Sequence, residues 1–190
     1  MVGMPGSGKS TLGVLLAKTL GFSFIDTDLI ISRRAGKPLQ AILNEDGLER
    51  FLVLEEDVGS TLECEYTVVA TGGSMVLSDK AMTHLAKMGT VVFIDVPFEE
   101  IERRVTNITT RGIVFHPDET LHDVYRQRLP LYEKYADMTV PVRPGNADIE
   151  MTVSMIAQAV GLDHRRATFS TKTAKLNKNK KLHGNYTFLT

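Results

Sequence analysis

Two kinds of hydrophobic pattern alternate along the chain. Short apolar runs lie at residues 22–26, 67–70, 91–96 and 138–142, and the run at 91–96 is almost continuous. Runs of this length and composition predict strands, and an uninterrupted run indicates a strand that is buried on both faces. Between the runs, apolar residues recur at every third or fourth position, which predicts helices with one apolar face.

The helical segments and the strands together predict the fold class. The predicted helices cover residues 11–20, 29–35, 39–44, 48–62, 78–88, 98–105, 121–136 and 148–160. Ser78 is the expected N-cap of its helix, and the helix over 121–136 is expected to continue through Pro130. Residues 107–119 include Gly112 and Pro117 and have no clear period, so a loop is expected there. Strands that alternate with helices predict an α/β fold in which helices cover both faces of a parallel sheet.

The strongest chemical signal is the glycine-rich segment GMPGSGKST at residues 3–11. A glycine followed by four residues and then Gly-Lys-Ser is the P-loop spacing, in which backbone N–H groups surround nucleotide phosphates. Lys9 supplies a charge for the β- and γ-phosphates, and Ser10 supplies a hydroxyl for Mg²⁺. The amphipathic helix directly behind the loop favours a nucleotide site over a plain glycine-rich turn. The predicted nucleotide contacts are Gly6, Ser7, Gly8, Lys9, Ser10 and Thr11.

The position of the P-loop near the first residue leads to a second prediction, which concerns the strand ahead of it. A P-loop normally follows a buried strand, and here Met1 and Val2 precede it. We therefore expect a short first strand and a weakly anchored P-loop, because each missing apolar residue forgoes roughly 1.5–3 kcal/mol of burial. Additional apolar residues ahead of Met1 are expected to raise the melting temperature.

Two acids follow the strand predicted at residues 22–26. Asp26 and Asp28 flank Thr27, and ligands of open α/β sheets bind beyond the carboxyl ends of the strands. In an extended chain the two carboxylates would point the same way, so that Asp26 could act on Mg²⁺ and Asp28 could accept a proton from a substrate hydroxyl. The alternative is that one of them caps the next helix.

A second glycine loop and two arginines complete the candidate site. Gly72 and Gly73 close the strand at 67–70 and could face a ligand, or could form a plain turn. Arg111 lies in the loop 107–119, and Arg128 lies on the helix that follows. An arginine can stabilise the charge on a transferred phosphoryl group or hold a carboxylate with two hydrogen bonds. The alternative for both arginines is an ordinary surface charge.

Composition limits the class of protein. Of the 190 residues 43% are hydrophobic and 24% are charged, as is usual for a globular domain, and no apolar run approaches the ~20 residues of a membrane span. The lone Cys64 excludes an internal disulfide, which agrees with a cytoplasmic location. We expect one domain over residues 1–162, no membrane partner and a monomer.

Residues 163–190 form a distinct C-terminal extension. They hold seven Lys or Arg and one Asp, a net charge of +6 within a chain whose total is −1. This composition indicates a disordered basic tail. A nucleic-acid partner is not favoured, because no stacking pattern interleaves the charges. Residues 186–190, Tyr-Thr-Phe-Leu-Thr, favour a strand and could pair with a sheet edge or replace a missing strand.

Taken in order, these motifs resemble the shikimate kinase family. The resemblance covers residues 3 to about 160 and rests on the segments GMPGSGKST, FIDTD, RRAG, EDGLERF, VVATGG and RLPLYEKYAD. It implies a three-layer P-loop kinase fold with a five-stranded parallel sheet, a short first strand and a lid over about 107–119. It also implies ATP and Mg²⁺ as cofactors, and transfer of the γ-phosphate to the 3-hydroxyl of shikimate.

The resemblance assigns roles residue by residue. It implies that Lys9 and Ser10 bind phosphate and Mg²⁺ and that Asp26 supports the metal. Asp28 then contacts the substrate hydroxyls as the candidate base. By the same resemblance Gly72 and Gly73 contact the substrate, Arg128 binds its carboxylate, and Arg111 is the lid arginine that meets the nucleotide and takes part in catalysis.

Three departures from the family pattern keep other functions open. Leu52 stands where the family has an arginine that binds the substrate carboxylate, Ser74 stands where a third glycine is usual, and the lid has the sequence TRGIVF where an Arg-Pro pair is usual. Two alternatives therefore remain. One is a kinase for another small hydroxy acid or polyol, and the other is a nucleotide-binding relative that does not catalyse.

Overall fold

The structure is a computed structural model that describes residues 1–105, 119–142 and 149–160. All of the predicted loop 107–119 except Glu119 lies outside these ranges, and so does the predicted extension 163–190. Arg111 is therefore a sequence prediction that the described residues do not reach.

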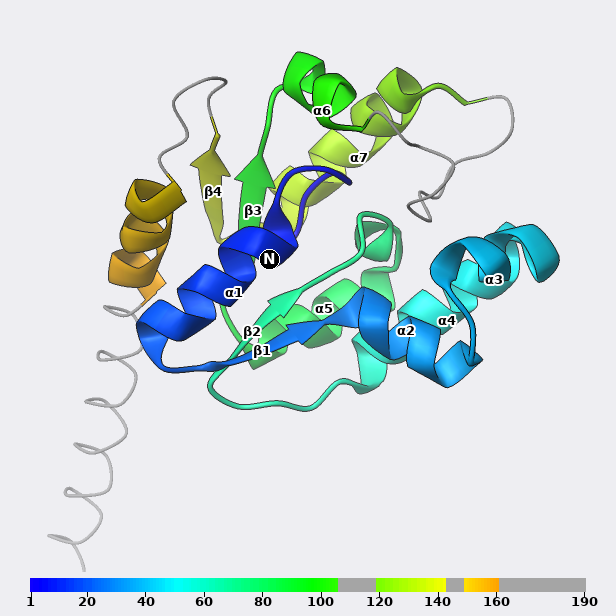
Figure 1. Cartoon of the computed structure of the whole chain (residues 1–190), viewed down its shortest axis with the longest axis horizontal. Helices are drawn as coiled ribbons and strands as arrows, with labels where there is room; N and C mark the ends of the chain where they lie inside the picture. The colour runs from blue at the N-terminus through cyan, green and yellow to red at the C-terminus, as the bar shows by residue number, and fades with distance from the viewer. Residues whose placement is uncertain (106–118, 143–148, 161–190) are drawn as a thin grey trace, which may run out of the picture.

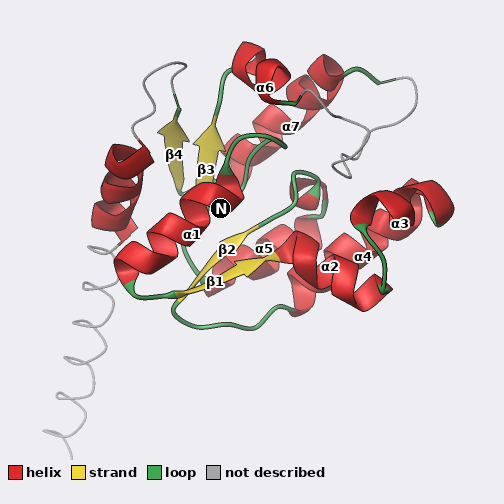
Figure 2. Ribbon diagram, in the orientation of Figure 1, coloured by secondary structure: helices red, strands yellow, loops and turns green. Residues whose placement is uncertain are grey.

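The described strands form two parallel pairs. Strand β1 (Ser23–Asp26) pairs with β2 (Thr67–Ala70), and β3 (Val92–Asp95) pairs with β4 (Met138–Pro141). All four coincide with the predicted runs to within one residue at either end. Because each pair is parallel and helices connect the strands, the α/β prediction is confirmed (Figure 2).

The segment ahead of the P-loop lies between the two pairs. The Met1 nitrogen donates to the carbonyl of Val69 at 2.6 Å, and the Met1 carbonyl accepts from the Thr71 amide at 3.2 Å. Val2 exchanges two backbone hydrogen bonds with β3, of 2.8 and 2.9 Å, and forms an isolated bridge there. The predicted five-stranded sheet is not continuous among the described residues, which form two parallel pairs with Val2 bridged to Phe93 of β3 between them.

Helices cover both sides of these strands. They are α1 (Lys9–Leu20), α2 (Thr27–Ala35), α3 (Leu39–Glu45), α4 (Gly47–Thr61), the 3₁₀ turn η1 (Met75–Leu77), α5 (Asp79–Met88), α6 (Phe98–Arg104) and α7 (Leu121–Tyr135). Residues 149–160 are also helical. In Figure 1, α1 lies in front of the strands, while α5 and α7 lie behind them. The two helical layers enclose the strands as predicted.

Local signals explain where the helices begin. The Ser78 hydroxyl accepts from the Ala81 amide at 3.1 Å, so Ser78 is the predicted N-cap of α5. Thr120 and Asp123 form a capping box at the start of α7, which continues through Pro130. The capping box fixes where α7 begins, and the buried side chain of Arg128 belongs to this helix.

Two apolar clusters hold the molecule together. The larger lies around Val2, β3 and β4 and includes side chains from α1, α5, α7 and the helix over 149–160. The smaller joins Ile31 of α2, Ile42 of α3, and Phe51 and Val58 of α4. Helices α2, α3 and α4 therefore form a subdomain with a core of its own, set to one side of the strands (Figure 1).

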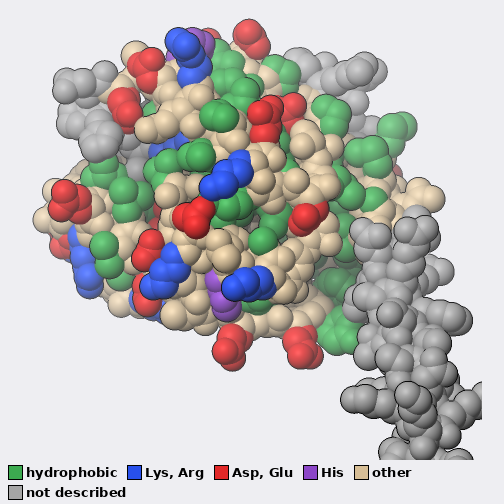
Figure 3. Space-filling view, turned by 180° about the vertical axis from the view of Figure 1, so that it is seen from behind, with side chains coloured by type: hydrophobic (Ala, Val, Ile, Leu, Met, Phe, Trp, Pro, Cys, Tyr) green, Lys and Arg blue, Asp and Glu red, His purple; other side chains and the backbone are tan. Residues whose placement is uncertain are grey.

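The surface carries charges of both signs. On the face opposite that of Figure 1, acidic and basic side chains are interspersed with apolar ones, and neither sign covers a broad area (Figure 3). Among the described residues, no helix is long and apolar enough to cross a bilayer.

Candidate functional site

The P-loop forms an open turn that delivers the chain into α1. Gly6 and Gly8 adopt φ values of 81° and 93°, in the left-handed region that side chains disfavour. A Cβ atom on Gly8 would meet nothing within 4 Å, so its need for glycine comes from the backbone angle. No side chain caps α1 at Gly8. The first amides of α1 are thus available to an anion, as the motif predicts.

Lys9 lies folded against the inside of the loop. Its Nζ donates to the carbonyls of Gly3 and Met4, both at 2.9 Å. Burial lowers the pKa of the ammonium to about 8, and the negative charges of Asp28 and Asp26 oppose that change. Lys9 therefore carries its charge at neutral pH and is held inside the loop, where it could meet an anion.

Asp26 combines the two roles that the sequence left open. Its Oδ2 accepts from the Ser10 hydroxyl at 2.7 Å, and its Oδ1 accepts from the amide of Asp28 at 3.0 Å. Asp26 is thus both the N-cap of α2 and the partner of the P-loop serine. The hydrogen bond between Ser10 and Asp26 therefore links the end of β1 to the start of α1.

Asp28 lies near Asp26 for a different reason from the one predicted. The prediction that the two carboxylates share a face of an extended chain is wrong, because α2 begins at Thr27 and Asp28 is helical. The pKa of Asp28 is raised to about 6, first by burial and then by the negative charge of Asp26, and the charge of Lys9 opposes both effects. Asp28 is therefore a carboxylate poised to change protonation close to neutral pH.

Glu55 of α4 is a site residue that the sequence prediction missed. The Glu55 side chain is 2% exposed, and its pKa is raised to about 7, mainly by burial. A hydrogen bond with Ser74 opposes this rise, and the negative charge of Asp28 adds to it. Among the described residues, no group hydrogen-bonds Glu55 Oε1 or Asp28 Oδ1. The signal in the sequence was a glutamate among the apolar positions of residues 48–62.

Gly72 lies against both of these carboxylates. A Cβ atom at Gly72 would collide with Glu55 Oε1 and would stand 2.8 Å from Asp28 Oδ1. Its amide donates to the Thr27 hydroxyl at 3.1 Å, which ties the end of β2 to the start of α2. A side chain at position 72 would therefore displace the carboxylates of Glu55 and Asp28.

The neighbouring Gly73 is held by α7. Its carbonyl accepts from the Tyr132 hydroxyl at 2.6 Å, and a Cβ atom would stand 2.6 Å from Pro5 of the P-loop. Tyr132 is buried and stacks on Phe93 with ring centroids 5.1 Å apart. The two predicted substrate glycines are thus packed between the P-loop, α2, α4 and α7.

Arg128 reaches the same place from α7. Its side chain is 2% exposed, which sets it apart from an ordinary surface arginine. Arg128 and Glu55 line the same cavity, and the charge of Arg128 lowers the pKa of Glu55. Arg104 of α6, which the sequence prediction also missed, donates to the Gly6 carbonyl at 3.4 Å and pairs with Glu100 at 2.6 Å.

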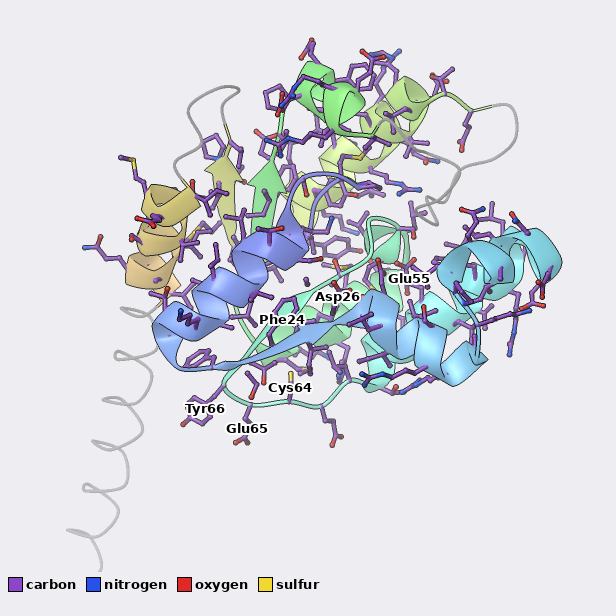
Figure 4. The ribbon with its side chains drawn as sticks, viewed as in Figure 1. Phe24, Asp26, Glu55, Cys64, Glu65 and Tyr66 are labelled. Carbon is purple, nitrogen blue, oxygen red and sulfur yellow. The ribbon has the colours of Figure 1, made fainter. Side chains whose placement is uncertain are left out.

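One cavity of about 690 Å³ brings these groups together. Its lining includes most of the predicted residues, namely Gly6, Ser7, Gly8, Lys9, Ser10, Thr11, Asp28, Gly72, Gly73 and Arg128. Asp26 reaches it through Ser10, and Leu52 is not part of the lining. Asp26 and Glu55 lie toward this end of the strands, whereas Cys64 and Tyr66 lie at the other end (Figure 4).

The oxygen atoms near the P-loop suit a hard cation. Mg²⁺ takes oxygen ligands, keeps several waters, and uses one or two protein groups together with substrate phosphates. The hydroxyl of Ser10 and the carboxylate of Asp26 are such a pair, 2.7 Å apart. Within the described ranges, no group of three or more His, Cys, Asp or Glu could hold a metal. The donor set therefore fits an ion shared with a bound phosphate.

Comparison with known protein sequences gives a consistent result. The model of the shikimate kinase family matches residues 5–160. A shikimate kinase of Thermobifida fusca is 39% identical over 142 residues, which cover 74% of this chain and 82% of that protein. A shikimate kinase of Paracidovorax citrulli is 35% identical over 167 residues, 85% of this chain and 91% of that protein.

Solved structures agree in fold. Shikimate kinase from Acinetobacter baumannii, in complex with shikimate, superposes with a TM-score of 0.75 at 29% identity, covering 85% of this chain and 91% of that one. Shikimate kinase from Aquifex aeolicus gives a TM-score of 0.70 at 30% identity, covering 86% and 95%. The fold described here is therefore the P-loop kinase fold of these proteins.

Proposed function

Because the chain belongs to the shikimate kinase family, we propose that it transfers the γ-phosphate of ATP to the 3-hydroxyl of shikimate. One observation carries this proposal. A single cavity brings together the P-loop lysine Lys9, the partly buried Asp28 and the buried Arg128. These are the groups that phosphate, an acceptor hydroxyl and an acceptor carboxylate each need.

The P-loop holds the phosphates of ATP. The amides at the start of α1 and the Lys9 ammonium provide positive charge where the β- and γ-phosphates bind. Lys9 now bonds to Gly3 and Met4 at 2.9 Å each, and it exchanges these carbonyls for phosphate oxygens when nucleotide enters. Arg104, at the Gly6 carbonyl, lies beside the same loop. Arg111 stays a prediction from family resemblance.

The acceptor binds on the other side of the cavity. Asp28 takes the proton of the attacking hydroxyl, a role suited to a carboxylate whose pKa is raised to about 6 by burial. Arg128 holds the acceptor carboxylate through its guanidinium, and the Gly72–Gly73 backbone lets the ring approach closely. One chain provides all of these groups, and we expect a monomer.

Ser10 and Asp26 are the residues that would hold Mg²⁺. A Mg²⁺ ion held there would supply positive charge that offsets the negative charge developing during phosphoryl transfer. Asp26 also fixes the first turn of α2, since its Oδ1 accepts from the Asp28 amide at 3.0 Å. The same side chain thus orients both the P-loop hydroxyl and the candidate base.

The proposal is tested by measuring ADP formation in a coupled assay with millimolar shikimate. We expect turnover that depends on shikimate, and the Lys9→Met variant should lose it by at least about 100-fold. The matched control is Lys18→Met on the exposed face of α1, which should keep the wild-type rate. No ADP above the shikimate-free rate would overturn the assignment of the acceptor. Full turnover by Lys9→Met would overturn the nucleotide site.

Leu52 favours a second candidate, a kinase for another small hydroxy acid or polyol. Leu52 packs against the cluster around Ile42 and Phe51, so this position gives no charge to the cavity. If Arg128 binds the shikimate carboxylate, shikimate methyl ester should show a KM at least about 10-fold higher, since a charge-assisted hydrogen bond is lost. Turnover of other hydroxy acids but not of shikimate would select this candidate. Nucleotide binding without any turnover would indicate a non-catalytic relative.

A further inference from the structure

A buried acid on α6 lies between two arginines. Glu100 is 5% exposed, although a carboxylate is almost never buried unless it is paired. Its Oε2 accepts from Arg103 Nε at 2.8 Å, and its Oε1 accepts from Arg103 Nη2 at 2.7 Å and from Arg104 Nε at 2.6 Å. The hydrogen bonds from Arg103 and then from Arg104 lower the pKa of Glu100 to about 2, so the carboxylate is ionised at neutral pH.

The two arginines differ in what else they reach. The side chain of Arg103 is 72% exposed, and among the described residues its guanidinium bonds to Glu100 alone. The side chain of Arg104 is 28% exposed and lines the cavity that holds the P-loop. Its Nη1 donates to the carbonyl of Gly6 at 3.4 Å. Glu100 is therefore connected to the nucleotide site through Arg104 and not through Arg103.

The C-terminal end of α6 packs directly against the P-loop, and both lie at the same end of the strands (Figure 1). A Cβ atom at Gly6 would stand 2.8 Å from Val105 Cγ2 and 3.7 Å from Arg104 Cβ. This contact fixes the backbone of α6 relative to the loop. It does not fix the direction of the Arg104 guanidinium, because several rotatable bonds separate that group from Cβ. The hydrogen bond from Arg104 Nε to Glu100 sets this direction.

We propose that Glu100 is a positioning residue of the nucleotide site, which holds the Arg104 guanidinium beside the P-loop, ready to contact the bound nucleotide. The carboxylate takes the Nε–H of Arg104, and Nη1 stays within reach of the loop. A side chain that is ordered before the ligand arrives loses less conformational entropy on binding. This inference rests on the proposed function only in requiring that a nucleotide binds at the P-loop.

The sign of the effect separates positioning from simple electrostatics. If Glu100 acted through its charge alone, its removal would strengthen the binding of the anionic nucleotide, because less negative charge would lie near the P-loop. If Glu100 positions Arg104, its removal weakens binding, because the freed arginine must be ordered at each binding event. The two roles therefore predict opposite changes in the Kd for ATP.

Equilibrium binding of ATP to the full chain, without an acceptor, tests the proposal. Glu100→Gln should raise the Kd for ATP by roughly 3- to 10-fold, the range expected for ordering one long side chain. The matched variant Glu99→Gln removes the same charge from an exposed position of α6 and should not raise the Kd. A Kd for Glu100→Gln at or below the wild-type value would overturn the proposal. A wild-type chain that binds no ATP would overturn the nucleotide site itself, and this proposal with it.

A double-mutant cycle shows whether Glu100 acts through Arg104. Arg104→Gln alone should also raise the Kd for ATP. Because the arginine is then absent, adding Glu100→Gln should change the Kd by less than about twofold. If the two substitutions instead have independent effects that multiply, Glu100 does not act through Arg104 and the proposal fails.

Steady-state kinetics separate positioning from a merely structural role. Glu100→Gln should raise the KM for ATP, while kcat and the KM for the acceptor stay within about twofold of the wild type. A lower melting temperature with both KM values unchanged would show that the ion pairs of Glu100 only stabilise α6, and would refute the proposal. If Glu100→Gln does not fold, Glu100→Asp gives the same readout, because it keeps the charge and draws the carboxylate back from Arg104 Nε. A wild-type Kd for ATP in Glu100→Asp would equally refute it.

Discussion

At the scale of single residues, burial decides what the carboxylates of the cavity can do. Asp26 is satisfied by Ser10 and by the Asp28 amide, whereas Asp28 and Glu55 each present an oxygen without a hydrogen bond from the described residues. A buried and poorly solvated carboxylate holds its proton more tightly, and the pKa values of about 6 and about 7 follow from this. The same property that costs stability makes Asp28 a better base near neutral pH.

The first prediction concerns Asp28→Asn. The amide keeps the shape but cannot accept a proton, so kcat should fall by roughly 10²–10⁴-fold. In the wild type, kcat/KM should fall tenfold per pH unit below about pH 6 as Asp28 is protonated. It should fall again above about pH 8, where Lys9 loses its charge. In the Asp28→Asn variant, the fall in kcat/KM below about pH 6 should disappear, and the fall above about pH 8 should remain. If initial-rate measurements on the variant still show the fall below about pH 6, Asp28 is not the base.

The second prediction concerns Glu55→Gln. The folded protein holds a proton on Glu55 up to about pH 7, while the unfolded chain releases it near 4.5, so ionisation of Glu55 destabilises the fold as pH rises through this window. The variant should be more stable than the wild type by roughly 1–3 kcal/mol at pH 8 and equally stable at pH 4. Urea unfolding at both pH values measures this. A variant that is less stable at pH 8 would show that the charge of Glu55 is well compensated.

At the scale of elements, hydrophobic pattern was sufficient to locate the strands and most helices. It failed at Asp28, where the side chain of Asp26 starts α2 at Thr27 and replaces extended chain by helix. It also did not assign Glu55 to the site, because a single glutamate on an apolar helix face has many explanations until its neighbours are known. Motif spacing predicted the P-loop and the loop after β2, but not that Tyr132 holds Gly73.

The third prediction tests how α7 supports that loop. Tyr132→Phe removes the hydrogen bond to the Gly73 carbonyl, at 2.6 Å, and keeps the ring that stacks on Phe93. We expect a loss of about 1 kcal/mol in the free energy of unfolding and a several-fold rise in the KM for the acceptor. Tyr135→Phe is the control, because its hydroxyl bonds to Asp79 on the surface. Equal effects on KM would refute a positioning role for Tyr132.

At the scale of the whole molecule, the site spans a junction. Asp28 and Gly72 follow strands β1 and β2, whereas Arg128 belongs to α7, which leads into β4 of the other pair. Val2 lies between the pairs, and its backbone fixes the P-loop relative to β3. The geometry of the cavity thus depends on how Val2 is bonded to β3, and hydrophobic pattern alone does not predict that backbone contact.

The last prediction is that weakening this junction loosens the molecule and the site together. Val2 is 2% exposed in the main core, so Val2→Ala should cost roughly 2–3 kcal/mol and lower the melting temperature by roughly 4–12 °C. The matched change Val14→Ala, at a position 49% exposed on α1, should stay within about 0.5 kcal/mol. Because Val2 leads directly into the P-loop, Val2→Ala should also raise the KM for ATP more than the KM for the acceptor. A stability loss with both KM values unchanged would mean that the P-loop is anchored by α1 alone.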